Sequence, residues 1–369
     1  MNRALLLLVV SALAARAAGF MADSMRGERL FQTLDCVRCH SVNGTGGTTA
    51  PDLGRMVDRS FTPASLAATM WNHGPTMWGS MHEHQIKPGE LDEQAAQDLM
   101  AFFYAARFFE KPGDAGRGKH AFESRGCAKC HGLTAPVDPK AKPVSEWNVI
   151  DDPLALVAAM WNHRADMIAE AGAKGMAPPQ LDTQDLTDIL VYLRNLPENR
   201  SKEGVFRVDV TGTDQPVFQS AGCAKCHQSE DTLANQIQGQ TLTEIAVEMW
   251  NHAPRMAAVG APMAPLPTGQ MQALVSSLWA VKFFEDAGRP KQGASVFAKH
   301  CAVCHADASS GVTQLPAAGQ EFGGAAMVSA LWKHGPPMLD RMKAKGLAWP
   351  RFDGTQMADL IAYLNSKHQ

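Results

Sequence analysis

The sequence predicts an all-α protein made of four small helical domains in tandem. Three observations support this fold class: a cysteine motif occurs four times, a second block follows each copy, and every repeat closes with an apolar stripe at helical spacing. The 369 residues are 45% hydrophobic and 19% charged, which is typical of a globular chain. The formal charge of −3 lacks the basic footprint of a nucleic-acid-binding protein, so no nucleic-acid partner is expected.

The cysteine motif reads Cys-x-x-Cys-His, and its four copies contain all eight cysteines of the chain. It is the attachment signature of c-type haem, in which two thiols form thioether bonds with the vinyl groups and the His binds the iron. A zinc site would need two cysteine pairs brought together, and a redox dithiol would need a βαβ setting. The sequence therefore predicts four covalent haem c groups. Their attachment residues are Cys36 and Cys39, Cys127 and Cys130, Cys223 and Cys226, and Cys301 and Cys304, and their proximal ligands are His40, His131, His227 and His305.

The second block lies downstream of each cysteine motif and carries one Trp, one His and one Met at constant spacing. Its members are Trp71, His73 and Met77 in the first copy, Trp161, His163 and Met167 in the second, Trp250, His252 and Met256 in the third, and Trp332, His334 and Met338 in the fourth. The histidines and the methionines are alternative candidates for the distal iron ligand. The tryptophans have two interpretations: an indole N–H that donates to a haem propionate while the ring covers the haem edge, or ordinary core packing.

We favour the methionines as distal ligands, because the Met is never replaced whereas the neighbouring apolar position changes from Met70 to Leu331. A Pro between the His and the Met in three copies predicts a helix break, with the Met on the first turn of a new helix. The histidines remain the alternative. Methionine ligation would raise the reduction potentials, and two histidines on each iron would lower them.

Each repeat is expected to begin with a short helix before its cysteines and to end with an amphipathic helix. The short helices are predicted at 27–34, 118–125 and 293–300, with a degenerate counterpart at 216–222, and the closing helices at 91–109, 181–196, 268–284 and 352–366. Asp92, Asp182, Thr268 and Asp353 are the predicted N-caps of the closing helices. The domains are predicted at 21–110, 111–200, 201–286 and 287–369, which we call repeats 1 to 4. The stretch 203–214, together with 197–201, is the predicted linker between two halves of two repeats each.

This arrangement resembles class I cytochrome c, repeated four times over essentially all of the chain after residue 20. The haem motif is the specific part of the resemblance, and Tyr192-Leu193 and Tyr363-Leu364 fit the closing helix of that family. The resemblance implies that the first helix of each repeat crosses the last. It also implies a distal Met in the loop before the last helix. That loop position falls at Ile86, Met176, Met263 and Leu347, of which two carry no sulfur.

Residues 1–20 have the features of a cleaved signal peptide. A short polar start precedes the apolar run 4–15, which is too short to span a bilayer comfortably, and small residues surround Ala17. An uncleaved anchor is the alternative. Export to the periplasm fits the chemistry, because haem c is attached outside the cytoplasm in bacteria.

Four haems on one chain predict a protein that transfers electrons between redox partner proteins outside the cytoplasm, with no enzymatic activity. One alternative is a haem subunit docked on a membrane-bound respiratory or photosynthetic complex. The other is a multihaem reductase, which would need one iron with an open distal side. All four repeats carry the same candidate ligands, so none stands out as an open site.

Overall fold

The structure is a computed structural model, and it describes residues 22–54, 61–106, 113–150, 152–199, 206–210, 215–227, 230–237, 240–261, 263–283, 287–306, 311–315 and 321–366. The predicted all-α class is confirmed: the described strands are limited to a hairpin of β1 (Ser41–Val42) and β2 (Thr45–Gly46). The predicted signal peptide lies outside the described residues. No helix in the described part of the chain is both long and apolar enough to cross a bilayer.

The four repeats share one order of elements: a short first helix, a turn that holds the cysteines, one or more middle helices, and a closing helix. Repeat 1 contains α1 (Ser24–Thr33), α2 (Pro63–Glu83) and α3 (Glu93–Ala106). Repeat 2 contains α4 (Ala115–Ser124), α5 (Pro153–Asn162), α6 (Arg164–Ala173) and α7 (Thr183–Arg194). Repeat 3 contains α8 (Gln215–Ser220), α9 (Glu230–Gln236), α10 (Leu242–Ala258) and α11 (Thr268–Phe283). Repeat 4 contains α12 (Pro290–His300), α13 (Ala302–His305), α14 (Gly324–Ala344) and α15 (Gly354–Ser366).

The closing helices begin close to the predicted N-caps. The Asp92 side chain accepts the N–H of Ala95, and the Asp353 side chain accepts the N–H of Gln356. Asp182 is the N-cap of α7, and its own N–H donates to the Asp185 carboxylate in a capping box. The prediction for Thr268 was wrong by one residue, because α11 already includes it and the carbonyl of Pro267 accepts the first helical N–H groups.

The first helix of a repeat crosses its closing helix at a glycine. These contacts join α1 to α3, α4 to α7 and α12 to α15. An added Cβ would lie within 1.8 to 2.0 Å of a closing-helix carbonyl oxygen in each pair: Gly27 against Asp98, Gly118 against Asp188 and Gly293 against Asp359. Only a residue without a side chain permits this approach of two backbones.

An ion pair fastens each of these three crossings. The closing-helix aspartates are almost fully buried, and an arginine of the first helix or its N-cap binds each one: Arg26 to Asp98 at 2.8 Å, Arg117 to Asp188 at 2.7 Å and Arg289 to Asp359 at 3.3 Å. Ala273 stands at the corresponding position of α11, seven residues after Leu266, so repeat 3 has no such carboxylate. The crossing in repeat 3 therefore rests on apolar contacts of α8 with α11.

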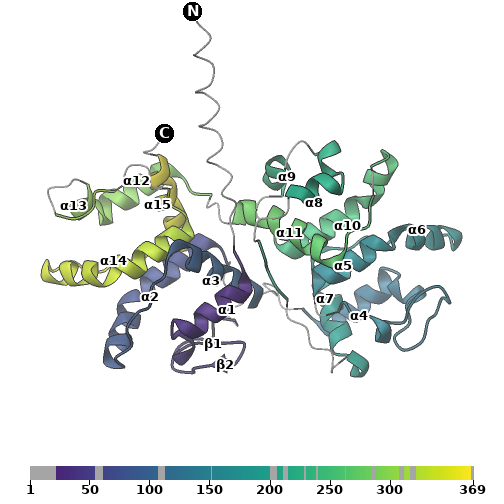
Figure 1. Cartoon of the computed structure of the whole chain (residues 1–369), viewed down its shortest axis with the longest axis horizontal. Helices are drawn as coiled ribbons and strands as arrows, with labels where there is room; N and C mark the ends of the chain where they lie inside the picture. Colours follow the sequence, from purple (N-terminus) through teal and green to yellow (C-terminus); the bar gives the residue numbers. More distant parts are fainter. Residues whose placement is uncertain are drawn as a thin grey trace, which may run out of the picture.

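The repeats pair in a nested order, 1 with 4 and 2 with 3, and not as neighbours along the chain. Figure 1 shows one lobe formed by α1–α3 and α12–α15 and a second lobe formed by α4–α11. Within the lobes, α2 contacts α14 and α15, whereas α5 contacts α10 and α11. The predicted division into repeats 1–2 and repeats 3–4 was therefore wrong, because the closing segments of 4 and 3 cover the middle helices of 1 and 2.

A reciprocal hydrogen-bond clamp holds each pair of repeats together. The indole N–H of every second-block Trp donates to a backbone carbonyl of the paired repeat: Trp71 to Pro350, Trp161 to Ala264, Trp250 to Pro179 and Trp332 to Gly89, over 2.7 to 3.1 Å. The Asn that follows the Trp makes two hydrogen bonds with one backbone residue, which lies two positions after the carbonyl that the Trp bonds. The side-chain amide donates to the carbonyl of this residue and accepts its N–H: Asn72 with Phe352, Asn162 with Leu266 and Asn251 with Leu181. In repeat 4 Lys333 replaces this Asn.

The predicted linker contributes to the junction between the two lobes. Its described parts are 197–199 and 206–210, and Phe206, Val208 and Val210 in the second part are buried. Ser24 donates its N–H to the Val208 carbonyl, and Val210 donates to the Ala22 carbonyl, so this segment bridges to the start of repeat 1. The interpretation as a simple linker was therefore wrong for these residues.

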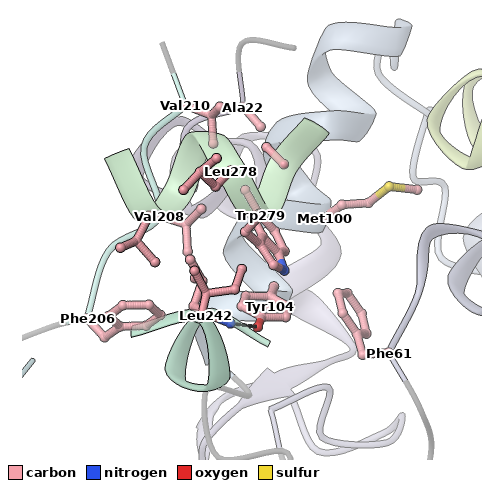
Figure 2. Packing of buried hydrophobic residues seen from close by; sticks show 14 of the residues in the cluster. Ala22, Phe61, Met100, Tyr104, Phe206, Val208, Val210, Leu242, Leu278 and Trp279 are labelled. Atoms are coloured by element: carbon pink, nitrogen blue, oxygen red, sulfur yellow. Dashed lines mark hydrogen bonds between the residues drawn. The ribbon is translucent and has the colours of Figure 1, made fainter. Parts of the chain in front are cut away.

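Repeats 1 and 3 meet beside that bridge. Figure 2 shows Phe61, Tyr104 and Trp279 packed together, with the Tyr104 hydroxyl oxygen accepting the Leu242 N–H at 3.1 Å. The Tyr104 and Trp279 ring centroids are 4.4 Å apart. The two lobes are thus joined by a buried core rich in aromatic residues.

The middle helices continue through the prolines that were expected to break them. Pro75, Pro254 and the pair Pro336-Pro337 lie inside α2, α10 and α14. The break occurs instead at His163, in the one repeat without this Pro. Pro75 cannot donate to the Trp71 carbonyl four residues earlier, and that carbonyl accepts the indole N–H of Trp349 from repeat 4 at 2.9 Å. The contact between repeats therefore compensates for the hydrogen bond that the proline removes.

We predict that Gly118→Ala destabilises the protein by about 3 kcal/mol, since the new methyl group must force α4 away from the backbone of α7. Gly172→Ala is the matched control, because a Cβ there meets nothing within 4 Å, and it should stabilise α6 by about 0.5 to 1 kcal/mol. Urea unfolding of the two haem-loaded variants measures both effects. Equal effects would contradict the close crossing.

We predict that Asn251→Ala lowers the free energy of unfolding by about 1 to 2 kcal/mol, because it removes both bonds to Leu181 across the pair of repeats 2 and 3. Lys333→Ala changes the same position of the repeat in the other lobe, where the Lys side chain is exposed, and should be close to neutral. Thermal unfolding of both variants tests the clamp. A neutral Asn251→Ala variant would show that the clamp adds no stability.

Candidate haem-binding sites

Each Cys-x-x-Cys-His motif forms the same tight turn. The N–H of the second Cys and the N–H of the His both donate to the carbonyl oxygen of the first Cys. The two distances are 3.2 and 3.0 Å in repeat 1, 3.2 and 2.9 Å in repeat 2, and 3.1 and 2.9 Å in repeats 3 and 4. One turn of backbone therefore presents two thiols and one imidazole in all four repeats, which is the donor set that covalent haem attachment requires.

The turn is entered through the left-handed region in the first three repeats. Asp35, Gly126 and Gly222 precede the first Cys with φ of 61°, 88° and 82°. The chain thereby leaves the first helix and turns sharply before the cysteines. Repeat 4 differs, because Cys301 follows α12 directly with φ −116° and its motif continues as α13.

The first thiol of each motif is held in an apolar setting. Burial raises the pKa of Cys36, Cys127 and Cys301 to about 11 in each case, so these thiols are neutral at pH 7. A zinc site or a reactive dithiol favours the thiolate form. Among the described residues, no three His, Cys, Asp or Glu side chains converge as a metal cluster would require. The geometry suits thioether attachment better than either alternative.

The proximal imidazoles are oriented by backbone carbonyls. Nδ1 of His40 bonds the Pro51 carbonyl at 2.9 Å, Nδ1 of His131 bonds the Lys142 carbonyl at 2.9 Å, and Nδ1 of His305 bonds the Thr313 carbonyl at 2.8 Å. A carbonyl oxygen only accepts, so Nδ1 carries the proton and Nε2 keeps its lone pair. This is the usual arrangement of a His that binds a metal through Nε2.

The proximal His faces the His of the second block in the first three repeats. The ring centroids are 6.0 Å apart for His40 and His73, 6.2 Å for His131 and His163, and 6.3 Å for His227 and His252. Burial lowers the pKa of His73 and of His227, and in each the neighbouring imidazole lowers it further. Burial also lowers the pKa of His131. In repeats 1 to 3 the structure therefore brings the predicted proximal ligand together with the His of the second block.

The methionines of the second block lie one turn beyond these histidines. Met77, Met167 and Met256 are half-buried and pack against the hydrophobic core, and Met338 lies at the matching position of α14. Because the helix continues, His73 and Met77 share one face of α2, as do His252 and Met256 on α10. The predicted placement of the Met on a separate helix holds only for Met167, on α6.

The loop position that the resemblance suggested for a Met ligand is part of a helix C-cap. The N–H groups of Ile86, Met176, Ala261 and Leu347 each donate to the carbonyl five residues earlier, directly after a residue with positive φ. Ala261 is thus the counterpart in repeat 3, and the alignment of Met263 with this position was wrong by two residues. Only Met176 carries sulfur there.

The indole N–H groups of the second-block tryptophans bond the paired repeat. All four N–H groups are committed to backbone carbonyls of the paired repeat. Of the two interpretations of Trp71, Trp161, Trp250 and Trp332, these bonds favour packing between repeats over a bond to a haem propionate. The Trp-Asn pair that recurs in repeats 1 to 3 therefore marks a contact between repeats. It stands directly before the second-block His, which is a candidate distal ligand.

Two other tryptophans, which the sequence did not single out, lie at the sites. Trp147 packs edge-on against His131 with centroids 5.1 Å apart, and its indole N–H donates to Lys142, the carbonyl that also accepts from His131. Trp78 is buried between α2 and α14, against Gly74 and Gly335, which follow His73 and His334. Its indole nitrogen bonds no atom in the described part of the chain, which leaves a buried donor free for a haem propionate.

The comparisons with known proteins agree with this geometry. Residues 24–104 and 115–197 match the family model of cytochrome c, and residues 288–364 match that of cytochrome c oxidase, cbb3-type, subunit III. These segments lie in repeats 1, 2 and 4, and the cysteine turn of repeat 3 lies outside them. No curated protein and no solved structure matches the chain. Cytochrome c domains carry covalent haem c, in keeping with the cysteine turns.

We predict that Trp161→Phe lowers stability by about 1 kcal/mol through loss of the bond to Ala264. The reduction potentials should stay unchanged, because the two bonds between Asn162 and Leu266 still anchor the helix before His163. Trp147→Phe is the matched comparison. It frees the Lys142 carbonyl to bond His131 more strongly, which makes that imidazole more basic and lowers one potential. Spectroelectrochemical titration separates the two. A shifted reduction potential in Trp161→Phe would contradict this prediction and indicate that the Trp161 indole contacts the haem.

Proposed function

We propose that this multihaem c-type cytochrome binds four covalent haems and transfers electrons between redox partner proteins outside the cytoplasm. The single observation that carries the count is the cysteine turn, which recurs with the same two hydrogen bonds in all four repeats. Repeat 3 keeps this turn even though its first helix is short and its Arg–Asp pair is absent. The count of four therefore rests on local geometry as well as on the motif.

Haem c supplies one-electron redox chemistry when it is bound, and the chain supplies attachment, orientation and shielding. The first thiol of the motif and the proximal imidazole are held by the turn, and the Nδ1 bonds fix the face that the imidazole presents. No acid, base or nucleophile is needed for outer-sphere electron transfer. We infer that the protein is a carrier and not an enzyme.

Export is part of the proposal. The features of residues 1–20 predict a signal peptide, and the periplasm is the compartment in which bacterial haem c is attached. The partners are then other redox proteins that dock long enough for an electron to cross.

A second candidate is a haem subunit of a membrane-bound respiratory complex. The observation that favours it is the match of residues 288–364 to the family described as a cbb3-type oxidase subunit. The two candidates differ in where the protein resides after export. A carrier is released with the soluble periplasmic fraction, whereas a docked subunit is recovered with solubilised membranes and a larger complex.

The haem count is tested by mass spectrometry of the exported protein under denaturing conditions. The expected mass includes four porphyrins that survive denaturation, and the variant with Cys223→Ser and Cys226→Ser should retain three. Three or fewer porphyrins on the parent chain would contradict the proposal. Carbon monoxide added to the reduced protein tests the reductase alternative, because a shifted spectrum would indicate an iron with an open distal side.

A further inference from the structure

We propose that the distal ligands of these haems are His73, His163 and His252, and not the methionines one turn later. This inference rests on the proposed function only in requiring a haem at each cysteine turn. His334 occupies the same position of α14 in repeat 4, where its side chain is exposed, and it is assigned this role by position alone. The inference reverses the preference that the sequence alone suggested.

The separation of the paired imidazoles fits one metal ion between them. A metal–nitrogen bond is about 2.0 Å long, and the nitrogen lies about 1.1 Å from the ring centroid. Counted on both sides of the metal, these lengths place the two centroids about 6.2 Å apart. The observed separations are 6.0, 6.2 and 6.3 Å in repeats 1, 2 and 3. Three pairs thus have nearly the same spacing, and it is the spacing of a shared metal.

The tautomers in repeat 2 suit ligation from both sides. Nδ1 of His163 bonds the Ala159 carbonyl at 2.5 Å, and Nδ1 of His131 bonds the Lys142 carbonyl at 2.9 Å. Both Nδ1 atoms therefore carry protons, and both Nε2 lone pairs remain available to a metal. A distal His that served only to hydrogen-bond a propionate would not need this arrangement opposite the proximal ring.

The histidine is also the residue whose position the fold fixes best. It follows directly on the Trp-Asn clamp, so Trp161 and Asn162 anchor the helix to repeat 3 immediately before His163. Met167 lies a full turn further along, on α6, beyond the helix break. The paired repeat thus sets the height of the distal imidazole over the haem.

A methionine sulfur cannot take the same coordination position while the imidazole occupies it. The ring of His73 already lies 6.0 Å from that of His40, which leaves room between the two rings for the metal alone. Met77, four residues later on the same face of α2, packs against the core. We therefore assign it to the wall of the haem pocket.

The test uses the haem-loaded protein, with the porphyrin mass checked first so that a missing haem is separated from a wrong ligand. In the oxidised parent protein, we expect no absorption band near ~695 nm, which is the mark of Met sulfur on ferric iron. With four haems present, a 695 nm band of the strength expected for Met ligation would overturn the inference.

Variants of repeat 2 assign one site. His163→Ala should convert about one quarter of the haem to a high-spin form that binds carbon monoxide, whereas Met167→Ala, the control one turn away, should leave all four haems low-spin. His163→Met keeps a ligand at the same height and should add a 695 nm band and raise one potential. If Met167→Ala produces the high-spin haem and His163→Ala does not, the methionine is the ligand.

Discussion

The contact between paired repeats is the constraint on which the rest of the structure depends. In three successive residues, the Trp and the Asn bond the backbone of the partner repeat and the His faces the proximal imidazole. A small domain of this size is marginal alone, and each repeat leaves its middle helix to be covered by the closing segment of another. Stability and ligand placement therefore come from the same hydrogen bonds.

The carbonyl of the second-block Trp is satisfied by different donors in repeats 1 and 2. Pro75 removes a helical hydrogen bond in α2, and Trp349 of repeat 4 replaces it at the Trp71 carbonyl. In repeat 2 the corresponding carbonyl, of Trp161, accepts from Arg164, whose guanidinium also bonds Met263 across the pair. The two lobes thus satisfy the same backbone atom with different side chains, an indole in one and a guanidinium in the other.

The sequence predicted the helices and the cysteine turns because their signals are local. The apolar stripe of α7 and the spacing of Cys127 and Cys130 need no knowledge of the rest of the chain. The nested pairing could not be predicted, because the acceptors of the clamp are backbone carbonyls, such as that of Pro350, 279 residues from Trp71. For the same reason the continuity of α2 through Pro75 was missed, since a distant indole supplies the lost bond. Every residue has a backbone carbonyl, so the type of amino acid at a position does not indicate that its carbonyl is an acceptor.

The nested pairing also decides which candidate haem sites lie in the same lobe. In chain order, sites 1 and 4 are furthest apart, yet α2 and α14 cross where Gly74 and Gly335 both lie against Trp78. Each of these glycines directly follows the candidate distal histidine of its repeat, so the two distal sides meet at one crossing. Contact between the lobes runs instead through repeats 1 and 3, at Tyr104. If each cysteine turn holds a haem as proposed, electron exchange would follow the pairing of the repeats and not their order in the chain.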